Sequence, residues 1–236
     1  MARLTRLAVA GHAHLILLRG HSGQPVFRDD VDRAAFLSFL AAACAGEHVA
    51  LHGYALLTDR VWLLGTPDSG PALGRTLQAL GRGFSVVFNR RHARRGSLWD
   101  GRYRSAVVEA GPSLLEAMVF VDLAPVRSGA AATALAAPWT SARRHAGASS
   151  EFPLTDSATY WALGNTPFDR CTAYESLLND PVGEEAALRI ERAVMRGWAL
   201  GSKAFQERLE KQLGRPMAPR PRGRPRRLQA RAQNLG

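Results

Sequence analysis

The chain has 236 residues, 46% of them hydrophobic, and a formal net charge of +11, which predicts a globular protein with a sizeable core. Its two cysteines, Cys44 and Cys171, lie far apart without metal-type spacing, which excludes a disulfide framework and a cysteine zinc site. Because His12, His14 and Arg19 interrupt the first apolar residues, we expect no signal peptide or membrane span and a cytoplasmic protein.

The first part of the chain predicts strands and helices in alternation. Residues 13–19 are a short apolar run that reads as a buried strand leading into a loop. Residues 29–45 open with acidic residues that can cap a helix and continue with apolar residues at largely helical spacing. Residues 49–57 and 61–66 are rich in strand-forming side chains and predict a hairpin.

The same alternation continues to the middle of the chain. Residues 71–92 predict a second long helix, residues 104–109 a short strand, and residues 114–123 a third helix that begins after Pro112 and ends near Pro125. The order β-α-β-β-α-β-α predicts an α+β fold, namely a ferredoxin-like antiparallel sheet with helices on one face.

The pattern changes beyond Pro138. Residues 157–213 predict only helices, separated by glycine- and proline-containing breaks, and the end of the chain has too few apolar residues to fold alone. We therefore divide the chain into a domain at 1–147, a helical region at 148–214 and a basic disordered tail at 215–236.

The basic tail contains seven arginines and no acidic residue, so most of the excess positive charge lies there. A nucleic acid is a better partner than a membrane surface, because no apolar face accompanies the arginines. Residues 219–227 resemble an AT-hook, in which Arg222, Arg224 and Arg226 would enter a narrow minor groove. The alternatives are nonspecific binding of DNA or RNA, and a tail that only adds solubility.

A second basic segment spans residues 82–104 and holds seven arginines, one acidic residue and several aromatic side chains. This mixture suits neutralisation of phosphates and stacking of unpaired bases. For Phe84 and Phe88 we prefer a place in the core, with the arginines as a solvated rim as the general alternative. The predicted DNA-binding residues of this segment are Arg90, Arg91, Arg94, Arg95, Trp99, Arg102 and Tyr103.

Several short motifs occur in a consistent order over residues 3–147. They are GHAHLILLRG followed by PVF, then FNRR, then SLWDGRY, and last APVRSG with PWTS. In these motifs the chain resembles the REP-associated branch of the single-tyrosine HUH transposases, with weaker likeness in WALG and GRPRR near its end. The resemblance implies an HUH-type α+β domain that binds hairpin DNA from repetitive extragenic palindromes.

The resemblance also implies a catalytic centre whose positions this chain fills differently. In the family two histidines and a further polar residue hold Mg²⁺ or Mn²⁺, and a tyrosine attacks the scissile phosphate to form a covalent intermediate. Arg60 and Trp62 stand at the histidine positions, Phe120 at the tyrosine and Ala124 at the polar ligand. Because none of these side chains can do the corresponding task, we expect no metal, no catalytic residue and loss of strand cleavage.

Two alternatives stay open at the level of sequence. An active transposase would need a centre rebuilt from residues such as His14, His52 and Tyr54, although we prefer structural roles for the histidines. An RNA stem-loop could fill the same groove as a DNA hairpin. We expect a DNA-binding protein without a membrane partner, and the resemblance to a family that forms dimers allows a homodimer.

Overall fold

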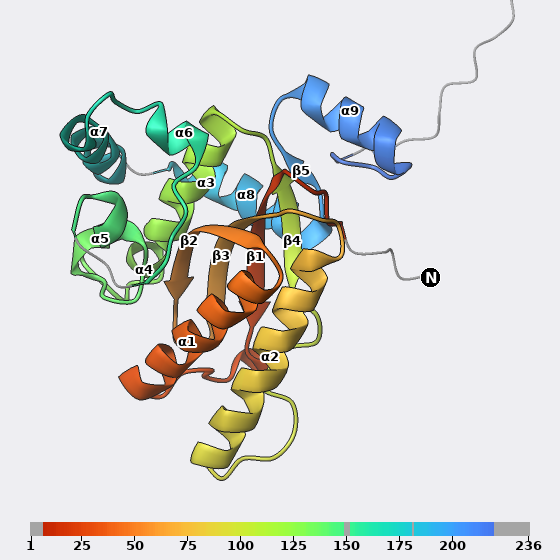
Figure 1. Cartoon of the computed structure of the whole chain (residues 1–236), viewed down its shortest axis with the longest axis vertical. Coiled ribbons are helices and arrows are strands. Elements are labelled where there is room, and N and C mark those ends of the chain that lie inside the picture. The colour runs from red at the N-terminus through yellow and green to blue at the C-terminus, as the bar shows by residue number, and fades with distance from the viewer. Residues whose placement is uncertain (1–6, 149–151, 181, 220–236) are drawn as a thin grey trace, which may run out of the picture.

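The computed structural model describes residues 7–148, 152–180 and 182–219, and its centre is a five-stranded sheet in the order β2-β3-β1-β4-β5. Helices cover this sheet on both sides (Figure 1). Strands β1, β2, β3 and β4 pair antiparallel, whereas β5 pairs parallel to β4. The strands are β1 (Ala13–Arg19), β2 (Val49–Leu56), β3 (Arg60–Pro67), β4 (Arg104–Val108) and β5 (Ala199–Leu200).

The central strand explains why both faces are covered. Leu15 and Leu17 of β1 belong to one hydrophobic cluster, while Ile16 and Leu18 belong to another. Successive side chains of a strand point to opposite faces, and an apolar residue at every position is typical of a strand buried on both sides. The sheet therefore needs a helical layer on each face.

Helices α1 (Asp30–Gly46) and α2 (Ala72–Arg91) pack together on the first face, which Figure 1 shows toward the viewer. The Asp29 side chain caps α1 by accepting a hydrogen bond from the Asp32 backbone N–H at 3.1 Å. The buried side chains of α1 and α2, among them Phe36 and Phe84, pack against the strand residues of that face. These two helices and strands β1–β4 confirm the predicted α+β class.

The second face is covered by α3 (Pro112–Asp122) and α8 (Glu184–Arg196), which contribute to the same core cluster. We expected the helices on one face of the sheet. Helices α1 and α2 share one face, whereas α3 and α8 cover the other. The second face is covered because α8, which comes late in the sequence, packs against β4. Its side chains Ile190 and Val194 are buried in the core of that face.

The C-terminal region differs from the purely helical pattern that we predicted. Ala199 and Leu200 form β5 beside β4, and both are buried. The side chain of Met217 is also buried there, and its carbonyl accepts a hydrogen bond from the Ala199 N–H at 2.9 Å. Strand β5 was missed because two residues are too short to show an alternating pattern.

A buried carboxylate ties several of the later helices to the core. Asp122, at the end of α3, is fully buried and accepts hydrogen bonds from Ser141 Oγ at 2.5 Å, His145 Nδ1 at 2.7 Å and Tyr174 Oη at 2.7 Å. His145 also bonds through Nε2 to the His52 carbonyl at 2.9 Å. The network thus joins α3 to three other segments, namely β2, the helix that begins after Ser141 and the helix that holds Tyr174, and it fixes how they pack.

The remaining helices are short or lie toward the C-terminal end of the described residues. Pro125 does not end the third helix outright, because α3 stops at Asp122 and a new turn, α4, carries the proline near its start. No helix within the described ranges is both long and apolar enough to cross a membrane. The remaining helices are α4 (Ala124–Arg127), α5 (Ala142–His145), α6 (Ala158–Trp161), α7 (Pro167–Asn179) and α9 (Lys203–Leu213), with 3-10 turns at His21–Gly23 and Ala134–Ala136.

Candidate nucleic-acid interface

The structure brings the predicted catalytic positions together on the second face of the sheet. Trp62 of β3 and Phe120 of α3 are in edge-to-face contact, with ring centroids 5.0 Å apart and an interplanar angle of 88°. Both are buried, as is Ala124 at the start of α4. Arg60 lies two residues before Trp62 on the same strand, and therefore on the same face.

Two arginines border this aromatic contact. The Arg60 guanidinium forks onto Asp59, with Nε 2.9 Å from Oδ1 and Nη2 2.7 Å from Oδ2. The Arg127 guanidinium lies over the Phe120 ring, 3.7 Å from its centroid. Two rings thus fill the place to which the resemblance assigns a metal and a nucleophile, and two guanidiniums lie beside them.

The donor chemistry of these side chains does not fit a divalent cation. A guanidinium offers only N–H donors, an indole N–H is a donor only, and the side chains of Phe120 and Ala124 have no lone pair. Among the residues that the structure describes, no group of three or more histidine, cysteine, aspartate or glutamate side chains could hold a metal ion. The two guanidiniums would also repel a cation brought to this place.

The histidines considered for a rebuilt centre have structural partners. His14 is fully buried, with Nδ1 2.8 Å from the His12 carbonyl and Nε2 accepting from the Val9 N–H at 3.1 Å. Burial lowers the pKa of His14 to about 4. His52 bonds to the Thr155 carbonyl and to Thr66 Oγ1, both at 2.8 Å. All four ring nitrogens are therefore occupied by the protein itself.

Tyr54 is also poorly suited to nucleophilic attack. Its ring packs edge-on against Phe152 with centroids 5.0 Å apart, and desolvation raises the pKa of its hydroxyl to about 12. A nucleophile needs a lowered pKa or an adjacent base. The raised pKa makes the Tyr54 hydroxyl harder to deprotonate, and therefore a weaker nucleophile toward a phosphate.

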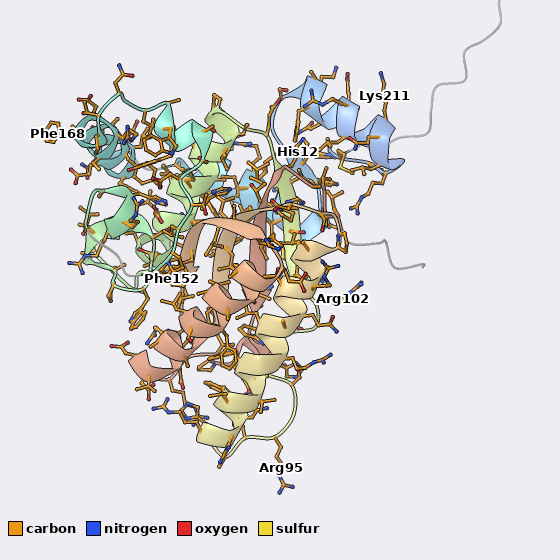
Figure 2. All side chains as sticks on the ribbon, in the orientation of Figure 1. His12, Arg95, Arg102, Phe152, Phe168 and Lys211 are labelled. Atoms are coloured by element: carbon orange, nitrogen blue, oxygen red, sulfur yellow. The ribbon has the colours of Figure 1, made fainter. Side chains whose placement is uncertain are left out.

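The arginines of residues 82–104 divide into engaged and exposed side chains. Arg91 forks onto Asp29 and also bonds to Asp32, so it holds the start of α1 against the end of α2. The Arg94 Nη2 donates to Gln24 Oε1 at 2.9 Å, and its guanidinium lies 5.8 Å from the Phe88 ring centroid. Arg90 and Arg95 are exposed, and Figure 2 shows Arg95 pointing away from the fold.

The predicted aromatic contacts need one correction. Trp99 is only 9% exposed, packs against Phe36 and Phe84 with ring centroids 6.1 Å away in both cases, and donates to the Gly81 carbonyl at 3.3 Å. An indole in this position belongs to the core and offers no open ring face to a base. Phe84 and Phe88 are core residues, as predicted.

The rest of the predicted binding residues fall into two groups. Tyr103 is half-buried against the first-face core, and Arg102 is exposed at the edge of the fold, as Figure 2 shows. The AT-hook-like residues Arg222, Arg224 and Arg226 lie outside the described residues.

Sequence reasoning missed several residues that the fold brings to the second face. Arg19 and Arg104 lie at the same end of the sheet as Arg60, and Arg127 and Glu191 reach that corner from α4 and α8. Arg104 was counted in the basic segment 82–104, and Arg127 lies in the APVRSG motif, but Arg19 and Glu191 carried no sequence signal. Strand register places Arg19 and Arg104 on the face of Arg60.

Comparison with known proteins supports the fold. No known protein family and no curated protein matches the sequence. A solved REP-associated tyrosine transposase bound to a REP hairpin superimposes with a TM-score of 0.51 at 11% identity, over 67% of this chain and 96% of the other. A protein of Deinococcus radiodurans assigned as a transposase reaches 0.35 at 21% identity, over 47% and 88%. The chain therefore has a tyrosine-transposase-like fold.

Proposed function

We propose that this protein binds hairpin or palindromic DNA without cutting it. The observation that carries the proposal is the pairing of a transposase-like fold with a Trp62–Phe120 contact where that chemistry needs ligands and a nucleophile. The similar solved transposase is bound to a REP hairpin, which supports a structured DNA ligand for this fold. Binding without a divalent metal is part of the proposal.

The surface chemistry supports an anionic partner. Three exposed arginines lie along the last turn of α2 and the loop that follows it, where they can neutralise phosphates, namely Arg90, Arg95 and Arg102. With Trp99 in the core, we assign this loop to the sugar-phosphate backbone rather than to stacked bases. Selectivity for a hairpin then follows from shape and from the spacing of phosphates.

We further propose that residues 219–227 add affinity for AT-rich duplex DNA through an AT-hook-like contact. A homodimer would suit a palindromic site, because two-fold symmetry in the protein matches two-fold symmetry in the DNA. Neither feature is needed for hairpin binding by the folded domain.

The direct test measures affinity for a palindromic DNA hairpin, its unpaired strand and an RNA hairpin of the same sequence, all in the presence of a metal chelator. We expect the DNA hairpin to bind most tightly, with affinity that falls steeply as salt rises. Tighter binding of the RNA hairpin would make the protein an RNA stem-loop binder. Binding that requires Mg²⁺ or Mn²⁺ would favour a rebuilt catalytic centre.

A further inference from the structure

Strand register gathers arginines at one end of the sheet. Arg19 of β1 stands directly opposite Arg60 of β3, and Leu17 stands opposite both Trp62 and Arg104. Directly opposed residues of antiparallel strands point to the same face. Arg19, Arg60 and Arg104 therefore share the face of Trp62, which is the face that carries the aromatic contact.

Arg127 reaches the same corner from α4. Its guanidinium lies on Phe120, whose ring contacts Trp62. The hydrogen bond to Asp59 and the nearby Glu191 raise the pKa of Arg60. Desolvation lowers the pKa of Arg127 to about 10, which Glu191 opposes, so the side chain stays protonated at neutral pH. The Glu191 carboxylate on α8 thus acts electrostatically on two of the guanidiniums.

The charge of this corner favours an anion. Four arginines and the carboxylates of Asp59 and Glu191 lie at this corner, and two of these arginines, Arg19 and Arg104, are exposed residues. The Arg60 side chain is 38% exposed despite its pairing with Asp59. A guanidinium presents planar, paired N–H donors that match the oxygens of a phosphate.

We infer that Arg19, Arg60, Arg104 and Arg127, named here the arginine cluster, bind one phosphodiester of the DNA backbone at the place of the absent metal centre. The inference deepens the proposed function and rests on it. In the resembling family a cation activates the phosphate. In this protein the guanidiniums of the arginine cluster would take the place of that cation, and they would hold the phosphate without activating it. No bond is formed or broken in this step.

The experiment combines a protein variant with a scan of the DNA backbone. Hairpins that each carry one neutral methylphosphonate linkage are titrated against the wild-type protein and against Arg60→Ala/Arg104→Ala. The double variant should bind the unmodified hairpin roughly tenfold more weakly, and the slope of log affinity against log salt should fall by about 1, because the contact with a single phosphate is lost. One linkage whose neutralisation weakens binding by the wild type should have no effect on binding by the double variant.

The matched control removes two positive charges elsewhere. Lys203→Ala/Lys211→Ala changes exposed residues of α9, and it should retain the wild-type linkage profile. Arg60→Lys should fall between wild type and the alanine variant, since it keeps the charge but not the fork. If the double variant fails to fold, the linkage scan is done with Arg19→Ala, which alters an exposed residue at the strand end.

The outcomes separate this inference from the proposed function. A wild-type protein that does not bind the hairpin overturns both. A wild-type protein that binds it, together with a double variant whose affinity and linkage profile match those of the lysine control, overturns the arginine cluster alone.

Discussion

Phe120 and Asp122 lie two residues apart on α3, yet their surroundings are opposite in kind. Phe120, which the sequence resemblance aligns with a nucleophilic tyrosine, contacts an indole ring and a guanidinium among the ring interactions described for it. Asp122 is fully buried, and both of its oxygens accept hydrogen bonds. The comparison shows that the buried carboxylate of Asp122 is engaged in hydrogen bonds that hold the fold, whereas the side chains of Trp62, Phe120 and Ala124 offer no lone pair for a metal.

The largest effect should come from removing the buried carboxylate. Asp122→Ala leaves His145 and Tyr174 with unsatisfied buried donors, so we expect the free energy of unfolding to drop by about 3–5 kcal/mol. Chemical denaturation measures this directly. A loss below about 1 kcal/mol would show that the network does not hold the later helices in place.

The next effect concerns acid sensitivity. Because the pKa of His14 is about 4 in the fold and 6.5 when unperturbed, only the unfolded chain takes up this proton between those values. Stability should therefore fall as the pH drops through that window, by about 2 kcal/mol between pH 6.5 and pH 5. Denaturant titrations of wild type and His14→Gln test this; the variant should start less stable and show a shallower pH dependence. An equal dependence of stability on pH in both proteins would show that His14 does not cause the acid sensitivity.

Deleting the tail should separate two kinds of DNA affinity. Because Met217 is buried beside β5, the truncation is best placed after Pro219, where it removes six arginines. We expect at least a roughly tenfold loss of affinity for AT-rich duplex at low salt and little change in hairpin selectivity. Competition between AT-rich and GC-rich duplexes at matched salt is the measurement. Equal losses on both would leave a nonspecific basic arm in place of the AT-hook.

A smaller loss is expected at the loop after α2. Arg95→Ala/Arg102→Ala should weaken hairpin binding roughly fivefold and lower the salt slope by about 2, since each arginine neutralises one phosphate. Lys211→Ala is the control; Figure 2 places Lys211 at the opposite end of the molecule from Arg95. Thermal unfolding should be unchanged in both proteins. Unaltered binding by the double variant would return these arginines to a solvated rim.

The smallest expected effect is none at all. Phe120→Tyr restores the hydroxyl at the nucleophile position but leaves Arg60, Trp62 and Ala124 without a ligand atom, so no nick should appear in a labelled hairpin with Mg²⁺ or Mn²⁺ present. Adding Arg60→His and Trp62→His is the minimum needed to rebuild a metal site. Nicking by the single variant would mean that a cation binds through other residues.

The sequence predicted the fold well where patterns were long and local. Strand β1 and helices α1 and α2 were placed within about a residue, because caps and apolar spacing mark their ends. The second helical layer was not foreseen, since α8 meets β4 only after a long excursion of the chain. Motifs in the sequence singled out Arg60, Trp62, Phe120 and Ala124, whereas the placement of Arg19, Arg60 and Arg104 on one face depends on register, which no local pattern encodes. Trp99 was predicted to contact DNA, but it packs in the core. Its burial depends on contacts between distant segments, which the local sequence does not show.

The most direct measurement of the central claim follows binding and covalent capture in the same tube. Labelled palindromic hairpin DNA is mixed with the wild-type protein, with chelator or with Mg²⁺ or Mn²⁺, and is analysed under native and denaturing conditions. The account predicts a retarded native complex whose affinity is the same with and without metal, and intact DNA free of protein after denaturation. A metal-dependent nick accompanied by a covalent protein–DNA adduct would contradict it.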